Sequence, residues 1–184
     1  GIPLGMMNQN FNNRLEYGEK AEQHFYNLFI QNNILAYISN GQSEVGDIWL
    51  PNLVSNIGKG FYLELKTKQM RSAYPDTGFN LSVAENYWNN LINGNDTLII
   101  FIDKQNGIYG NFVSNLFYKY PDKKSFYHIQ EESAYPRCEA GILYFHKDSF
   151  ENIDYLKRYL QLKDLDEQLL LNQISIRRNK WAKT

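Results

Sequence analysis

The sequence predicts an α/β (α+β) domain with a central mixed β-sheet flanked by helices. The predicted elements follow in the order helix, three strands, helix, strands and C-terminal helices, which is the order of a layered domain. The run from Thr97 to Asp103 is almost continuously apolar, as is typical of a strand buried on both faces. The chain has 184 residues, 43% of them hydrophobic, so we expect one domain with a sizeable core.

The first half of the chain predicts a helix followed by an antiparallel meander. A helix is predicted over residues 13–32, where apolar and small residues recur at helical spacing: Leu15, Gly18, Ala21, Phe25, Leu28 and Phe29. Three strands are predicted over 34–39, 45–50 and 60–67, the second of them closed by Pro51-Asn52. Residues 68–81 contain Pro75, Asp76 and Gly78 and predict a loop.

The second half predicts one more helix, three strands and a helical end. Ser82 and Glu85 have the spacing of a capping box, which predicts a helix over 83–92. Strands are predicted over 97–103, 108–113 and 141–146, with an irregular, aromatic-rich segment at 114–139. Two helices then follow, one over 150–161 capped by Asp148 or Ser149, the other roughly from 164 to 178.

These elements predict three parts of the chain. Residues 1–6 are interpreted as a remnant of expression, with Met7 as the natural start. Residues 7–148 form the core domain. Residues 149–184 form a helical extension whose leucines either pack on the core or form the face of a homodimer.

The composition excludes several classes of protein. One cysteine, Cys138, excludes an intramolecular disulfide framework, a cysteine-based zinc site and a four-cysteine iron–sulfur cluster. No P-loop or dinucleotide fingerprint supports ATP hydrolysis or hydride transfer. No apolar run approaches the ~18 residues needed to span a membrane, so we expect no membrane partner. The use of a single cysteine is typical of a reduced protein, so we expect a cytoplasmic location, in a bacterial, archaeal or phage-infected cell. The 19 basic and 20 acidic residues nearly cancel, so no uniform basic surface is expected.

The segment Glu64-Leu65-Lys66 carries the most chemical information. Alternate side chains of a strand share a face, so Glu64, Lys66 and Lys68 should point the same way, opposite to Leu63 and Leu65. An amphipathic strand with a solvated face would explain the charges equally well, and Glu-x-Lys by itself occurs by chance.

Two further acids make the segment informative. Asp47 lies in the apolar centre of the preceding predicted strand, so adjacent strands could place it beside Glu64. Such an oxygen-rich site suits Mg²⁺, with Lys66 next to it. Glu22 lies on the apolar stripe of the first helix with Gly18, Phe25 and Phe29, and a buried carboxylate needs a partner.

This set of residues resembles the PD-(D/E)xK nuclease superfamily, which has the restriction-endonuclease-like fold. The residues that carry the resemblance are Gly18-x-x-x-Glu22, Gly46-Asp47-Ile48 and Glu64-Leu65-Lys66, in this order, within roughly residues 14–103. Gly46 stands where the proline that names the family would be. The literal Pro75-Asp76 lies downstream of Glu64 and is interpreted as a turn.

The resemblance implies a metal-dependent site. Asp47, Glu64 and the backbone carbonyl of Leu65 would bind Mg²⁺, which Mn²⁺ should be able to replace, and Glu22 would bind directly or through water. Lys66 would position the attacking water. Lys68 either contacts a phosphate or is the solvated end of the strand. Glu85 either matches the polar residue that many members carry on the following helix or belongs to the capping box with Ser82.

The implied function is a Mg²⁺-dependent DNA endonuclease of restriction or phage and mobile-element type. Alternatives within the superfamily are a Holliday-junction resolvase and a DNA-repair exonuclease. Outside it, the alternatives are a non-catalytic DNA-binding or assembly protein on this fold and a chance match in an unrelated α/β domain. Two groups of basic residues are candidate DNA contacts. The first, Lys119, Lys123 and Lys124, could instead be a solvated loop. The second, Arg177, Arg178 and Lys180, could instead be basic residues that stabilise the C-terminal end of a helix.

Overall fold

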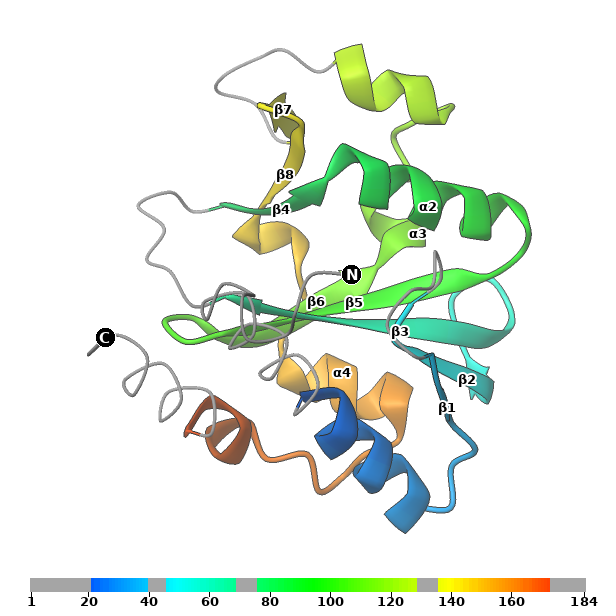
Figure 1. The fold of residues 1–184 in the computed structure, drawn as a ribbon, viewed down its shortest axis with the longest axis vertical. Coiled ribbons are helices and arrows are strands. Elements are labelled where there is room, and N and C mark those ends of the chain that lie inside the picture. The colour runs from blue at the N-terminus through cyan, green and yellow to red at the C-terminus, as the bar shows by residue number, and fades with distance from the viewer. Residues whose placement is uncertain (1–20, 40–45, 69–75, 129–135, 173–184) are drawn as a thin grey trace, which may run out of the picture.

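A five-stranded mixed sheet forms the middle layer of the molecule (Figure 1). The computed structural model of the chain describes residues 21–39, 46–68, 76–128 and 136–172. The strand order is β1-β2-β3-β5-β6, and only β3 and β5 are parallel neighbours. The strands are β1 (Tyr37–Ile38), β2 (Ile48–Val54), β3 (Lys59–Lys68), β5 (Asp96–Asp103) and β6 (Gly107–Phe112). The predicted α/β class with a central mixed sheet is therefore confirmed.

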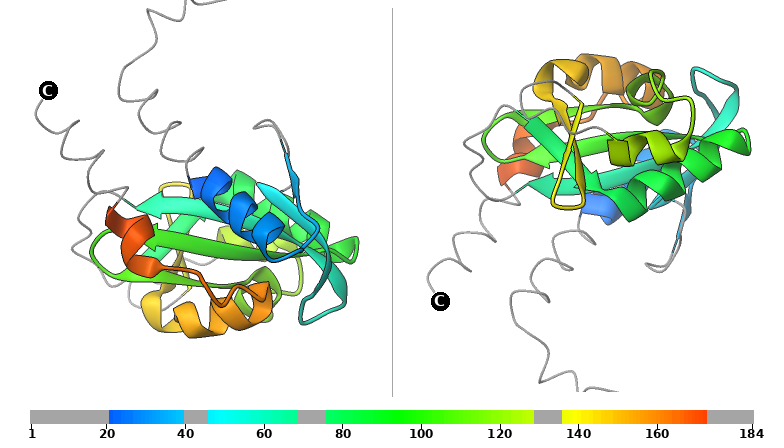
Figure 2. Two further views of the ribbon diagram at one scale, coloured as in Figure 1. Left: turned by 90° about the horizontal axis from the view of Figure 1, so that it is seen from below. Right: turned by 90° about the horizontal axis from the view of Figure 1, so that it is seen from above.

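Helices cover both faces of this sheet (Figures 1 and 2). The N-terminal helix, residues 21–31, and α4 (Ile153–Leu160) lie on one side. On the other side lie α2 (Leu81–Ile92), α3 (Val113–Leu116) and a small sheet of order β4-β8-β7. Its strands are β4 (Asp76–Asn80), β8 (Ile142–His146) and β7 (Arg137–Glu139). None of the helices in the described ranges is long and apolar enough to cross a bilayer.

Strand β5 divides the core into two halves. Leu98, Ile100 and Ile102 pack with residues of the N-terminal helix and α4. Ile99 and Phe101, which alternate with them, pack against α2 and α3. All eight residues of β5 are buried, which explains the continuous apolar run and confirms the predicted two-sided burial.

The first strands differ in extent from the prediction. Strand β1 covers only Tyr37 and Ile38 of the predicted 34–39. Strand β2 continues through Pro51, where the prediction ended it. Proline is tolerated there because β1 pairs only with Ile48 and Trp49, so Pro51 has no ladder partner on that side. The register with β3 also shifts between Leu50 and Val54.

Two segments predicted as irregular contain regular structure. The predicted loop 68–81 is wrong from residue 76 onward, because Asp76–Asn80 pairs with β8 as β4. The predicted irregular segment 114–139 contains the end of α3, the 3-10 helix η2 (Lys123–His128) and β7. Pairing with distant strands stabilises β4 and β7, and this pairing leaves no local pattern in the sequence.

The predicted helix caps are wrong. Helix α2 begins at Leu81 with Asn80 as its N-cap and no side-chain capping bond, so Ser82 lies inside the helix and no capping box forms. Helix α4 begins at Ile153, where Asn152 Oδ1 accepts from the backbone of Asp154 at 3.0 Å. Asp148 and Ser149, the predicted caps, lie in the 3-10 helix η3 (Lys147–Ser149).

The C-terminal leucines pack on the core. Leu160, Leu162, Leu165 and Leu170 are buried in the same cluster as the N-terminal helix, whereas Leu169 is 46% exposed. Of the helix predicted from 164 to 178, residues 167–172 are helical and residues 173–178 lie outside the described residues.

Candidate active site

The register of β2 and β3 brings Asp47 opposite Glu64. Ile48 pairs with Leu63 and Trp49 with Tyr62, so the residue before Ile48 faces the residue after Leu63. Beyond the last paired residues of β2 and β3, a side-chain hydrogen bond also joins the two segments: Leu65 N donates to Asp47 Oδ2 at 2.8 Å. The two acids are therefore neighbours, as the predicted strand order requires.

The backbone around Asp47 is fixed by close contacts. Ser39 Oγ donates to the Gly46 carbonyl at 2.7 Å, and Ser39 N donates to the Asp47 carbonyl at 2.9 Å. A Cβ added to Gly46 would lie 2.8 Å from Tyr62 Cβ and 3.0 Å from the Leu63 carbonyl oxygen. Glycine is required there because β3 passes too closely for a side chain.

Glu64 is a largely buried acid beside another acid. Burial is the main cause that raises its pKa to about 8, and the charge of Asp47 raises it further. Lys66 opposes this shift, with Nζ 3.9 Å from Glu64 Oε1. Burial also raises the pKa of Asp47, although the Leu65 N–H, Glu22 and Lys66 each lower it. Two neighbouring acids with raised pKa values form a site that favours an additional positive charge.

Glu22 reaches this site from the N-terminal helix. Its side chain is close enough to the Asp47 carboxyl group to lower the pKa of that acid, against the larger effect of burial, which raises it. Asp47 is thus the partner expected for Glu22, while Gly18, one turn earlier in the sequence, lies outside the described residues.

Tyr87 is a site residue that the sequence reasoning missed. It lies on α2, is 3% exposed, and its hydroxyl is near enough to the Glu64 carboxylate to lower the pKa of that acid. The hydroxyl nevertheless completes no hydrogen bond of good geometry within the described part of the chain. A buried O–H without a partner is costly, so this one is available to Glu64 or to a bound water. The spacing of Ala84, Tyr87 and Leu91 could have placed Tyr87 on the inner face of α2.

The oxygen atoms at this site are suitable ligands for a hard cation. Asp47 and Glu64 offer carboxylate oxygens, and the Leu65 carbonyl faces the same side as the Leu65 N–H that binds Asp47, because the two groups of a strand residue point together. Across the described ranges, no three Asp, Glu, His or Cys side chains form a complete metal-binding group. Mg²⁺ commonly takes one or two carboxylates and fills its other positions with water and phosphate, so this pair fits it.

Lys68 and Glu85 are both engaged by neighbouring elements. Lys68 Nζ donates to Thr77 Oγ1 on β4 at 2.8 Å, so this side chain is not merely the solvated end of a strand. Glu85 accepts a hydrogen bond from the Tyr127 hydroxyl, which joins α2 to η2. Because α2 begins at Leu81, Glu85 lies beyond the first turn and is not a capping residue, and its role in catalysis stays a prediction.

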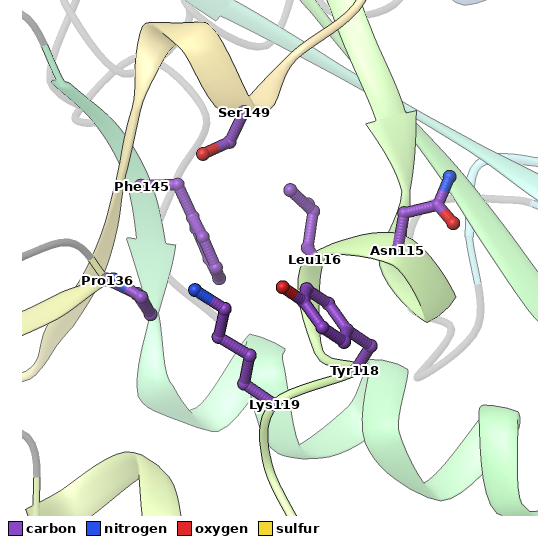
Figure 3. Close-up of a pocket in the computed structure, with 7 residues that line it drawn as sticks. All are labelled: Asn115, Leu116, Tyr118, Lys119, Pro136, Phe145 and Ser149. Carbon is purple, nitrogen blue, oxygen red and sulfur yellow. The ribbon is translucent and has the colours of Figure 1, made fainter.

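The candidate DNA-binding lysines lie away from the acids. Lys119 lines a pocket of about 250 Å³ with Tyr118 and Pro136, and the lining contains none of the proposed catalytic residues (Figure 3). Its ammonium lies 5.6 Å from the centre of the Tyr118 ring. Lys123 and Lys124 are exposed on η2. Arg177, Arg178 and Lys180 lie outside the described residues.

The fold and the site together describe an α/β protein with three carboxyl groups and a lysine near one another, beside β3 and the start of β2. No known protein family matches the sequence, and no curated protein matches it either.

Proposed function

We propose that this protein is a Mg²⁺-dependent nuclease that hydrolyses phosphodiester bonds in DNA, acting as an endonuclease. The observation that carries the proposal is the proximity of Glu22 on the N-terminal helix, Asp47 just before β2, and Glu64 and Lys66 on β3. It also supports the resemblance to the PD-(D/E)xK nucleases, since these are the four charged residues of the motifs that carry that resemblance.

Burial argues against the simplest alternative, an amphipathic strand with a solvated charged face. The side chains of Glu64 and Lys66 are only 17% and 25% exposed, and their charged atoms are 3.9 Å apart. Keeping ionisable groups out of water is costly, so a site that uses them is the better explanation. A non-catalytic protein on this fold would be expected to have lost at least one member of the set, and all are present.

In the proposed mechanism, Asp47, Glu64 and the Leu65 carbonyl would hold Mg²⁺. When bound there, the cation would supply charge neutralisation at the scissile phosphate and would make a nearby water more acidic. Lys66 lies beside Glu64 and therefore next to whatever Glu64 binds, where it orients the attacking water and stabilises the developing charge. Glu22 holds the Asp47 carboxyl group, and the Tyr87 hydroxyl can donate to Glu64.

A cleavage assay on several DNA forms tests the proposal. The protein is incubated with supercoiled, linear, branched and single-stranded DNA, in Mg²⁺ or in EDTA, beside Asp47→Ala and Lys66→Ala variants. We expect cleavage of supercoiled DNA by the unmodified chain in Mg²⁺ only. Exclusive cleavage of branched DNA or of ends would identify a resolvase or an exonuclease instead. Equal behaviour of all three proteins on every substrate would refute a nuclease site at these residues.

A further inference from the structure

A buried chain of hydrogen bonds begins at Lys68, two residues after the proposed catalytic lysine. Lys68 Nζ donates to Thr77 Oγ1 at 2.8 Å, and Thr77 Oγ1 lies 2.8 Å from the Tyr109 hydroxyl. The Tyr109 hydroxyl in turn donates to Asp103 Oδ2 at 2.7 Å. Thr77, Tyr109 and Asp103 are only 0%, 8% and 3% exposed. Buried side chains of β4, β6 and β5 therefore hold the Lys68 ammonium in place.

The direction of every hydrogen in this chain is determined. Tyr109 has one hydroxyl hydrogen, which it gives to Asp103, so it can only accept from Thr77. Thr77 must then donate to Tyr109 and accept from Lys68. Hydrogen bonds from Tyr109 and from the turn at Asn106 outweigh burial and keep the pKa of Asp103 below its ordinary value. A cation at one end and an anion at the other therefore hold the chain in a single orientation.

The position of Lys68 relates this chain to the proposed active site. Lys68 follows Glu64 and Lys66 on one face of β3, since alternate residues of a strand share a face. Residues two apart on a strand are roughly 6.5 to 7 Å apart. That spacing resembles the distance between successive phosphates along one nucleic-acid strand.

We infer that Lys68 is a phosphate-binding residue that contacts the phosphate next to the scissile one, and that Thr77, Tyr109 and Asp103 are its positioning residues. The inference rests on the proposed nuclease function. An ammonium has three N–H donors, so the bond to Thr77 is compatible with a simultaneous contact to a phosphate oxygen. The anchored side chain loses little conformational freedom when DNA binds, which favours affinity.

The first test compares Lys68→Met with Lys163→Met, a change at an exposed lysine beyond α4. Fluorescence anisotropy with a labelled duplex gives the slope of log Kd against log salt, and cleavage assays give KM and kcat. One lost phosphate contact makes the slope less negative by about 0.9 for a duplex. We expect that change for Lys68→Met, with KM raised about tenfold and kcat within about threefold. Lys163→Met should match the unmodified chain.

The second test separates positioning from simple structural support. Thr77→Val removes the hydroxyl but leaves the charge, so KM should rise several-fold while the salt slope stays near its original value. Thr77→Ser keeps the hydroxyl and should restore KM. If Lys68→Met leaves KM and the slope unchanged while the original chain cleaves DNA, this inference fails and the nuclease function stands. If the original chain cleaves no DNA, the proposed function fails first. If Thr77→Val lowers only Tm, the chain is purely structural.

Discussion

Lys66 is the residue on which the proposed chemistry depends most. Its ammonium is part-buried and 3.9 Å from a Glu64 carboxylate oxygen, close enough to act on a water held by that acid. Removing one donor that stabilises transition-state charge costs about 10² to 10³ in kcat. We therefore expect Lys66→Met to lower the single-turnover cleavage rate by about that factor while Tm and DNA affinity change little. Lys163→Met, at an exposed lysine outside the proposed catalytic set, should leave kcat unaltered. An equal loss in both variants would contradict the assignment.

Glu64 gives the site a characteristic dependence on pH. Its pKa of about 8 lies above its ordinary value of 4.5, so between these values the folded state binds more protons than the unfolded state. The free energy of unfolding then falls as pH rises through this window, by about 1.4 kcal/mol per unit of pKa shift at most. In EDTA, Tm should decrease between pH of about 5 and about 8, and Glu64→Gln should flatten this decrease. An unchanged slope in Glu64→Gln would show that other groups cause it.

At the scale of elements, the close packing of Gly46 against β3 determines where Asp47 lies. Gly46→Ala would force a Cβ against Tyr62 and the Leu63 carbonyl, an overpacking that costs about 1–3 kcal/mol and displaces the start of β2. We expect cleavage to fall by more than tenfold, measured well below the Tm of the variant. Leu50→Val is a suitable control, since it destabilises the same strand by about 1 kcal/mol through a lost methylene without touching Gly46. Equal losses of activity in both would point to stability alone.

Elements with a strong local pattern could be predicted from the sequence. Strand β5 has a continuous apolar centre and β3 alternates, and both were expected within a residue or two of their ends. Strand β4 could not be predicted, because Asp76 and Gly78 are typical of turns. Gly78 is present for another reason: a Cβ there would collide with the Leu143 carbonyl of β8. The start of α2 was also mispredicted: Ser82 and Glu85 have capping-box spacing, but the helix begins at Leu81, with Asn80 at the N-cap position and no side-chain capping bond. The Leu81 N–H donates to the Gly141 carbonyl instead.

The charged residues of the candidate site could be predicted from the sequence, whereas most of the uncharged ones could not. Asp47, Glu64 and Lys66 could be found because each is a charged residue inside an apolar strand, and Glu22 because it interrupts an apolar helical stripe. Thr77 and Tyr109 could not, because uncharged polar residues are common in strands of this kind. Helical spacing places Tyr87 on the inner face of α2 but does not indicate a role for it. The importance of all three depends on which hydroxyl faces which charge, and only the packing of α2, β4 and β6 decides that.

At the scale of the whole molecule, the near-zero net charge limits how the protein can bind DNA. With a formal charge of −1, binding must rely on local groups, so affinity should be modest and strongly dependent on salt. Two layers of helices support the central sheet, and both contribute to the site. The N-terminal helix supplies Glu22 from one side and α2 supplies Tyr87 from the other. The site therefore requires the complete layered fold and cannot be reduced to the β2–β3 pair.

The central claim, Mg²⁺-dependent hydrolysis at the Asp47–Glu64 pair, is tested most directly by one rate comparison. Single-turnover cleavage of supercoiled DNA is measured for the original chain and for Asp47→Asn, in Mg²⁺ and in EDTA, after Tm has shown both proteins to be folded. We predict rapid cleavage by the original chain in Mg²⁺, none in EDTA, and a rate at least about 100-fold lower for Asp47→Asn. Cleavage that survives EDTA, or that is equally fast in Asp47→Asn, would contradict the account.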